Sequence, residues 1–360
     1  MKNFVLLLSL TTSNFVFSQE NLLKFVNPFI GTEKMGHTYP GATAPFGAVQ
    51  LSPDTDTISY ELNGKYNLDV YKYCAGYRYE DKTIVGFSHT HFSGTGHSDL
   101  GDFLVMPTVG KLKMNPGTAQ NPDSGFRSRF SHEEESAEPG YYSVNLKDYN
   151  VKAELTATTR VGVHKYTFPK SDDAHIILDL MSGIYNYDGK TTWTYVRVVN
   201  DSTVTGYRQT NGWARTRTVY FAMTFSKPFK SFGRKDFDTQ QVYRGFWRKF
   251  NQNENFPEIA GQKIRVHFDF DTQEGEELMI KFALSPVSQS NAMENLLTEA
   301  PGWDFEAIKK TTQNDWNKEL NKIQIKASEN DKINFYTAMY HTFLGPTVYM
   351  DVNGQYKGLD

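Results

Sequence analysis

Five side chains that could bind a metal ion or hydrogen-bond a substrate lie in one segment, GFSHTHFSGTGHSDLGD at residues 86–102: His89, His91, His97, Asp99 and Asp102. Imidazoles and carboxylates at this spacing suit Zn²⁺ or a similar ion. A His-x-His pair on a strand places both rings on one face, which predicts a shared environment for His89 and His91. One candidate function is therefore a metal hydrolase centred on His89, His91 and Asp99.

The same segment suits two other roles. Closely spaced histidines also occur as hydrogen-bonded, partly buried side chains without any ion. Imidazole, hydroxyl and carboxylate groups can equally bind sugar hydroxyls, and Gly94 and Gly96 would let the backbone approach a ligand. For Asp99 and Asp102 we expect substrate contact or loop bracing rather than catalysis.

Aromatic residues and a long loop are compatible with sugar binding. Aromatic residues make up 14% of the chain, and their faces can stack on sugar rings, although a β-rich core would also use them. Residues 27–55 are rich in Gly and Pro, which predicts either a functional loop surface or an irregular cap on a sheet. Trp213, in the run NGWA, could be a core residue or a stacking platform for sugar, and of the two we expect it to lie in the core.

No carboxylate pair stands out for acid–base catalysis. A glycosidase that inverts the anomeric centre needs two carboxyl groups roughly 6.5–9.5 Å apart. The consecutive Glu133, Glu134 and Glu135 are instead expected to be a solvated or helix-capping run.

The elements that would position these groups are mostly strands. Apolar and polar residues alternate over residues 151–155 and 264–270, as in half-buried strands. The other expected strands cover residues 161–168, 176–180, 194–199, 219–225 and 278–284. Many short strands without intervening helices predict a β-sandwich.

Helical periodicity begins after Pro286. We expect helices over residues 291–298, 305–323 and 333–343, the last capped by Asn330 or Asp331, and then a hairpin around Asn353–Gly354. The two longer helices have wide apolar faces that need partners, and no later sequence supplies them. We therefore expect the chain to stop inside a domain, with residues 303–360 of low stability in isolation.

The first 18 residues resemble a secretion signal. Lys2 precedes an apolar run over residues 4–10, and Val16 and Ser18 fit a cleavage site before Gln19. We expect export to the periplasm or medium, without membrane insertion after cleavage. Cys74 is the only cysteine, so no intrachain disulfide can form, and export without disulfides indicates a bacterial source. The net charge of −3 does not favour nucleic-acid binding.

A series of unusual runs resembles glycoside hydrolase family 92 and covers nearly the whole chain after residue 26. In order, they are NPFIGT, GHTYPGATAPFG, QLSPDT, CAGYRY, GFSHTHFSGTG, SDLGD, SHEEESAEPGYY, AELTATTRVGVHKYTFP, GYRQTNGWA and FYTAMYHTFLGPTVYMDVNGQYKGLD.

This resemblance implies a calcium-dependent, exo-acting α-mannosidase that inverts the anomeric centre and removes terminal mannose from N-glycans or mannan. It implies a mainly β fold: a large sandwich of the galactose-mutarotase-like or supersandwich type over residues 22–285, a helical linker over 286–345, and the start of an (α/α) toroid over 346–360. The general acid, the general base and the calcium ligands would lie in the toroid beyond Asp360. The chain alone would then hold no catalytic or metal-binding residue and would be inactive.

The resemblance also implies that loops of the sandwich line the sugar-binding cleft. The residues expected to contact the sugar are His37, Tyr71, Cys74, His89, His91, Ser93, Asp99, Asp102 and Asp360. The chain departs from the family in two places. Tyr71 and Lys72 stand where many members have Trp-Asp, after an inserted stretch near residues 58–69, and His97 stands where the family often has Cys. The preferred linkage therefore stays open.

Three functions follow from these observations. The first is the substrate-binding portion of an α-mannosidase that acts on mannose-containing glycans. The second is a carbohydrate-binding module without catalysis. The third is the metal hydrolase described above.

Overall fold

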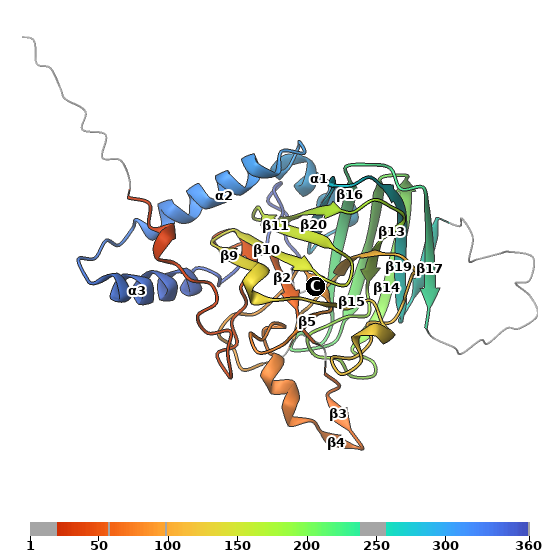
Figure 1. Cartoon of the computed structure of the whole chain (residues 1–360), viewed down its shortest axis with the longest axis horizontal. Coiled ribbons are helices and arrows are strands. Elements are labelled where there is room, and N and C mark those ends of the chain that lie inside the picture. The colour runs from red at the N-terminus through yellow and green to blue at the C-terminus, as the bar shows by residue number, and fades with distance from the viewer. Residues whose placement is uncertain (1–19, 57, 98, 238–256, 359–360) are drawn as a thin grey trace, which may run out of the picture.

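The computed structural model describes residues 20–56, 58–97, 99–237 and 257–358. Two large antiparallel sheets pack face to face, and helices follow them in the chain (Figure 1). The predicted β-sandwich with a helical C-terminal part is confirmed. The predicted signal segment and Asp360 lie outside the described residues. Among the residues described, no helix is both long and apolar enough to cross a lipid bilayer.

The smaller of the two sheets has seven strands in the order β1-β2-β6-β7-β13-β19-β17. Its strands are β1 (Ala42–Thr43), β2 (Gln50–Asp54), β6 (Gly86–Ser88), β7 (Leu104–Val109), β13 (Ser171–Asp179), β19 (Ile264–Thr272) and β17 (Ser231–Asp236).

The larger sheet has nine strands in the order β18-β14-β15-β16-β20-β12-β11-β10-β9. Its strands are β9 (Glu135–Glu138), β10 (Tyr141–Leu146), β11 (Val151–Ala157), β12 (Val161–Phe168), β14 (Thr191–Asn200), β15 (Thr203–Thr210), β16 (Arg217–Phe225), β18 (Glu258–Gly261) and β20 (Glu276–Ser285).

Short elements fill the loops at the sheet ends. Two further strand pairs are β3 (Glu61–Leu62) with β4 (Lys65–Tyr66), and β5 (Thr83–Ile84) with β8 (Ser128–Arg129). The 3₁₀ helices are η1 (Leu23–Phe25), η2 (Leu68–Tyr73), η3 (Pro122–Ser124) and η4 (His132–Glu134). The β3–β4 hairpin projects from the sandwich at the bottom of Figure 1.

Alternation of side chains explains the strands that the sequence predicted. In β19, Ile264, Val266, Phe268 and Phe270 are buried in the core that the two sheets share. Arg265 is also buried. Its charge is compensated by Asp179 on the neighbouring β13, whose Oδ2 accepts from Arg265 Nε at 2.6 Å. Six of the seven strand segments expected from the sequence fall within observed strands, and the seventh, residues 176–180, extends one residue past the end of β13 at Asp179.

Three helices follow the last strand within the described residues: α1 (Gln289–Glu299), α2 (Phe305–Leu320) and α3 (Glu329–Thr342). Each begins after a side chain that accepts from the first turn, and for α3 this is Ser328, bonded to Asp331 N at 3.2 Å. The predicted caps Asn330 and Asp331 are therefore wrong. After Asp351 the described chain makes a turn but no strand pair, so the predicted hairpin is wrong as well.

The helices find partners that the sequence analysis overlooked. The segment after residue 21 packs between α2 and α3, where Leu22 and Phe25 join Trp316 and Tyr340 in one buried cluster. Trp316 Nε1 also donates to Thr43 O at 2.6 Å, which ties α2 to the sandwich. The expectation that this chain supplies no partner for these helices is wrong, because its own N-terminal part covers them.

Candidate functional site

Three segments far apart in sequence meet at His37. The edge of its ring faces Tyr71, with ring centroids 4.8 Å apart and planes at 86°. The carbonyl oxygen of His37 accepts from Gly94 N at 2.7 Å. A Cβ on Gly96 would lie 2.1 Å from the Tyr71 hydroxyl oxygen, so only glycine lets this loop approach Tyr71 so closely. The structure therefore brings together His37, Tyr71 and the loop that holds Ser93, all of which are among the residues expected to contact the sugar.

Two polar atoms at this site have no hydrogen-bond partner among the described residues. These are His37 Nε2 and Ser93 Oγ, both shielded from solvent. Burial lowers the pKa of His37, which favours the neutral ring, while a hydrogen bond to the Tyr71 backbone opposes the shift. A neutral imidazole and a hydroxyl can each donate to or accept from a sugar hydroxyl. Such buried, unpaired groups are the expected property of a site that a polar ligand completes.

Cys74 is a buried residue that helps to hold Tyr71 in place. Its buried thiol donates to Tyr71 O at 3.1 Å, and Asn67 caps the 3₁₀ helix η2 that carries Tyr71. The ring of Tyr71 is 42% exposed. Cys74 therefore positions Tyr71 instead of presenting its own sulfur to the surface, which differs from the predicted direct sugar contact.

His91 braces a neighbouring turn. Its Nδ1 lies 2.8 Å from Gln50 O, and its Nε2 lies 2.9 Å from Asp54 Oδ1. A Cβ on Gly76, which has φ +77°, would lie 2.1 Å from that carboxylate oxygen and 3.2 Å from the His91 ring. Both ring nitrogens of His91 are hydrogen-bonded within the fold. The His91 ring therefore supports the backbone at Gly76 from the protein interior.

His89 belongs to the core of the sandwich. Its Nδ1 lies 2.7 Å from Phe103 O, its Nε2 lies 3.0 Å from His164 Nε2, and His164 Nδ1 lies 2.8 Å from the Tyr166 hydroxyl. Because the carbonyl can only accept, the protons have one consistent order: Tyr166 donates to His164, His164 to His89, and His89 to Phe103. Burial lowers the pKa of His89 to about 3 and lowers that of His164 strongly, so both rings are neutral.

These contacts contradict the metal-site hypothesis. Strand β6 ends at Ser88, so His89 and His91 do not share a strand face, and each uses both ring nitrogens elsewhere. Among the described residues, the metal-like grouping of histidine, cysteine or carboxylate groups is instead His175, His267 and Asp269 on β13 and β19. Both histidines already bond Asp269 Oδ1 through Nδ1, at 2.7 and 2.8 Å.

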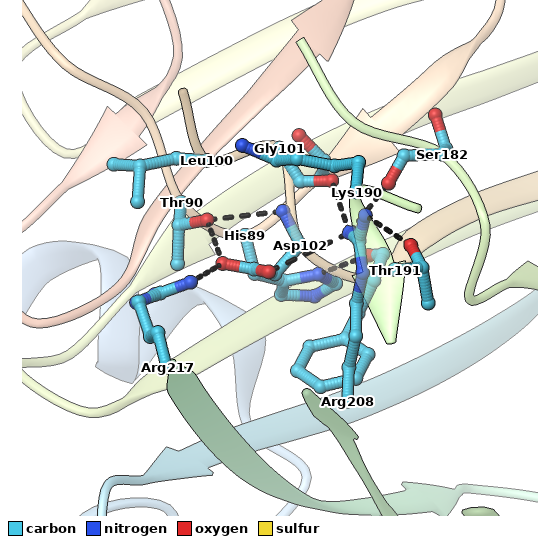
Figure 2. A network of polar contacts seen from close by, with 12 residues as sticks. His89, Thr90, Leu100, Gly101, Asp102, Ser182, Lys190, Thr191, Arg208 and Arg217 are labelled. Carbon is cyan, nitrogen blue, oxygen red and sulfur yellow. Dashed lines mark hydrogen bonds and ion pairs between the residues drawn. The ribbon is translucent and has the colours of Figure 1, made fainter. Parts of the chain in front are cut away.

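Asp102 is held by two arginines rather than exposed to a ligand. Its carboxylate accepts from Thr90 Oγ1 at 2.6 Å and from Arg217 Nη1 at 2.5 Å, with Arg208 Nη1 at 3.5 Å. Figure 2 shows Thr90 and the two arginines around this carboxylate. Burial favours the neutral acid, yet the cationic Arg217 and Arg208 hold the pKa of Asp102 well below its usual range. Asp102 therefore braces the loop, one of the two roles expected for it.

Asp99 braces the loop in a similar way. Lys190 donates to Asp99 Oδ1, and the backbone nitrogen of Trp213 donates to Asp99 Oδ2 at 3.1 Å. Burial favours the neutral form of Asp99, but the bond and charge of Lys190 lower its pKa. Lys190, Arg208 and Arg217 were missed by the sequence analysis because they lie about 90 or more residues along the chain from their partners, where no local pattern could indicate them.

Trp213 and His97 form a stacked aromatic pair in which Trp213 is exposed and His97 is half-buried. Trp213 is 66% exposed, and its ring stacks on His97 with centroids 4.1 Å apart and planes at 11°. The ring of Phe92 meets the indole in an edge-to-face arrangement, with centroids 5.9 Å apart. The expectation that Trp213 lies in the core is wrong, because Trp213 lies in a bend over residues 212–216, between the end of β15 and the start of β16, and not within a sheet.

Glu135 also differs from its prediction. Its carboxylate accepts from the hydroxyls of Tyr77 and Tyr142, at 3.0 and 2.5 Å, and lies 2.6 Å from His132 Nδ1. The side chain is fully buried, while Glu133 and Glu134 stay at the surface. The three glutamates are therefore not one solvated run.

Comparison with known proteins identifies the family. Residues 25–285 match the Glycosyl hydrolase family 92 N-terminal domain, and residues 291–360 match the Glycosyl hydrolase family 92 catalytic domain. The chain belongs to glycoside hydrolase family 92. The resemblance noted in the sequence runs is thereby confirmed.

Solved structures of this family resemble the chain closely. A family 92 α-mannosidase from Bacteroides thetaiotaomicron in complex with mannoimidazole is 40% identical, with a TM-score of 0.84 over 94% of this chain and 42% of that protein. A family 92 inverting mannosidase from Bacteroides thetaiotaomicron VPI-5482 is 25% identical, with a TM-score of 0.72 over 93% of this chain and 41% of that protein.

A curated relative points the same way. A protein of Arthroderma benhamiae described as an uncharacterized secreted glycosidase is 24% identical over 92% of this chain. The chain covers 43% of that relative and thus spans less than half the length of the family members compared with it.

Proposed function

We propose that this chain forms the sugar-binding wall of an exo-acting, inverting α-mannosidase that removes terminal mannose from N-glycans or mannan. The observation that carries the proposal is the 40% identity, over 94% of the chain, to an α-mannosidase whose structure contains mannoimidazole. The site supports it chemically, since His37 Nε2 and Ser93 Oγ offer unpaired polar atoms beside exposed aromatic rings.

The general acid and base belong, in this proposal, to the part of the relatives that the chain does not cover. Inversion needs one carboxylic acid and one free carboxylate, with room for water between them. At this site Asp54 bonds His91, Asp99 bonds Lys190, and Asp102 bonds Arg217. Carboxylates tied to cationic or histidine partners in this way suit loop bracing, so we expect the 360-residue chain alone to bind mannosides without cleaving them.

We also propose that calcium binds in the part of the relatives that this chain does not cover, because the carboxylates of this site already have other partners. Ca²⁺ prefers six to eight oxygen ligands. The site carboxylates are already hydrogen-bonded. The grouping of His175, His267 and Asp269 could supply two nitrogen ligands and a single carboxylate, and that carboxylate already bonds both histidines. These residues do not fit a calcium ion, so no step of the proposal depends on one bound to them.

Export to the periplasm or medium is part of the proposal. It is supported by the signal-like first 18 residues and by a curated relative described as secreted. An N-terminal signal would be removed before the enzyme meets glycans outside the cytoplasm.

Hydrolysis of 4-nitrophenyl α-mannoside tests the proposal. The complete product, meaning a protein that also contains the region of the relatives that this chain does not cover, should release nitrophenol, lose activity under a calcium chelator, and regain it with added Ca²⁺. The first sugar released, followed by proton NMR, should be β-mannose. Release of α-mannose would contradict inversion, and binding of mannosides without any hydrolysis by the complete product would favour the carbohydrate-binding module.

A further inference from the structure

A cavity lies beside the β3–β4 hairpin. Its volume is about 550 Å³, and its wall includes Tyr60, Tyr187, Asp179, Lys190 and Arg265. Binding cavities for small ligands commonly measure 300–1,000 Å³. The size is therefore suitable for a short saccharide.

The inserted stretch builds one side of this cavity. Ser59, Tyr60 and Glu61 line it, and they lead into the β3–β4 hairpin. Tyr60 N donates to Asn186 O at 3.2 Å, and Asn67 N donates back to Tyr60 O at 2.8 Å. The insertion that separates this chain from the common family pattern is thus fastened to the loop after β13, so that Tyr60 reaches the cavity.

Aromatic rings connect this cavity to the loop of the first site. Tyr60 lies 4.7 Å from Tyr185 and 6.2 Å from Tyr187, measured between ring centroids. Tyr185 lies 6.3 Å from His97, which stacks on Trp213. The rings form a continuous series from the surface to the cavity, in the order Trp213, His97, Tyr185, Tyr60 and Tyr187.

The cationic side chains of the wall lie in ion pairs. Lys190 pairs with Asp99, Arg265 with Asp179 at 2.6 Å, and Lys263 with Asp188 at 3.5 Å. Each cation thus has an anionic partner already. A neutral ligand with many hydroxyls suits such a wall better than a phosphate or a carboxylate, which would compete with these pairs.

We infer that this cavity is a second saccharide site, which holds inner residues of a mannose-containing chain whose terminal residue occupies the site at His37. The inference rests on the proposed function and extends it, because it assigns the enzyme a preference for oligosaccharides over single mannosides. Tyr60 and Tyr187 supply the stacking faces, and the paired Lys190, Asp179 and Arg265 supply hydrogen bonds to hydroxyls.

Titration calorimetry with linear α-mannotetraose and with methyl α-mannoside tests this inference on the full chain. Tyr187→Ala and Tyr60→Ala should each raise the Kd for the tetrasaccharide about tenfold and leave that for the monosaccharide unchanged. Tyr195→Ala is the matched control, since Tyr195 is a half-buried tyrosine that stacks on Tyr207 away from the cavity. In the unmodified chain, with ring-labelled tyrosine, the tetrasaccharide should shift the NMR signals of Tyr60 and Tyr187, a readout that needs no variant.

Four results would overturn the inference: no tetrasaccharide binding by the unmodified chain, tyrosine signals that stay in place, unchanged Kd values in both variants, or an equal loss for the monosaccharide. The proposed function fails separately. Absent hydrolysis of 4-nitrophenyl α-mannoside by the complete product, with normal tetrasaccharide effects in this chain, would reject only the α-mannosidase. Normal hydrolysis by the complete product, without tyrosine effects in this chain, would reject only the second site.

Discussion

The two ends of the segment from His89 to His97 lie in different surroundings. His89 is fully buried and hydrogen-bonded to His164, whereas His97 lies at the surface under the exposed ring of Trp213. His91, between them, is committed to Asp54 and Gln50. The first two histidines of the segment therefore stabilise the fold, and the last one lies near the surface where we propose that a ligand binds.

This difference shows why spacing alone misled the metal hypothesis. Three histidines close in sequence can share an ion only if their free nitrogens converge. Here the strand ends at Ser88, the chain turns, and each ring meets different partners. The candidate binding groups of this site are identified from their unpaired polar atoms and exposed rings. Only the three-dimensional structure shows these properties.

The largest effect is expected from the network that braces the loop. Asp102→Asn would leave the fully buried Arg208 without its charge partner, which should lower the free energy of unfolding by about 3–5 kcal/mol. Urea unfolding measures this change. Asp123→Asn, which removes an exposed partner of Arg129, should leave the midpoint unchanged, and equal midpoints for both variants would contradict the bracing role.

A smaller loss of stability is expected when the buried hydrogen bonds among His89, His164 and Tyr166 are removed. His164→Phe removes the partner of both His89 and Tyr166, which should lower the free energy of unfolding at pH 7.5 by about 2–4 kcal/mol. Urea unfolding again provides the measurement.

The same core predicts a pH dependence. The pKa values of His89 and His164 are lowered by folding, so their contribution to stability is complete above about pH 6.5 and is progressively lost as the pH falls below that value. In His164→Phe the slope of unfolding free energy against pH near pH 5 should fall by about 1.4 kcal/mol per pH unit. An unchanged slope would mean that His164 is protonated in the folded chain.

The aromatic pair should affect binding and hardly stability. Trp213→Ala removes an exposed ring, so the unfolding midpoint should stay within experimental error, while the Kd for α-mannobiose should rise about tenfold. Trp193→Ala removes another exposed tryptophan, on β14, and serves as the control. If both variants bind α-mannobiose like the parent, Trp213 is not a sugar platform.

The smallest effect concerns the unpaired imidazole. His37→Ala should weaken α-mannobiose binding about three- to tenfold, the net value of one hydrogen bond. Calorimetry at pH 7.5 measures it, and tighter binding by the variant would contradict a contact between His37 and the sugar.

The sequence predicted the sandwich well, because alternation along strands such as β11, β12 and β19 reflects which face is buried. It predicted the meeting of His37, Tyr71 and the residue 93 loop only through family resemblance. It could not predict that Lys190 and Arg208 brace Asp99 and Asp102, since these partners come from other strands and loops. The exposed position of Trp213 likewise depends on a bend that alternation does not encode.

Histidine imidazole signals, followed by NMR during titration of the isotopically labelled chain with α-mannobiose, test the account most directly. We expect the signals of His97 and His37 to move, while His89 and His164 keep the nitrogen shifts of neutral, hydrogen-bonded rings throughout. Movement of His89 with His97 and His37 unchanged would contradict the account, because it would place the ligand in the region that we assign to the core.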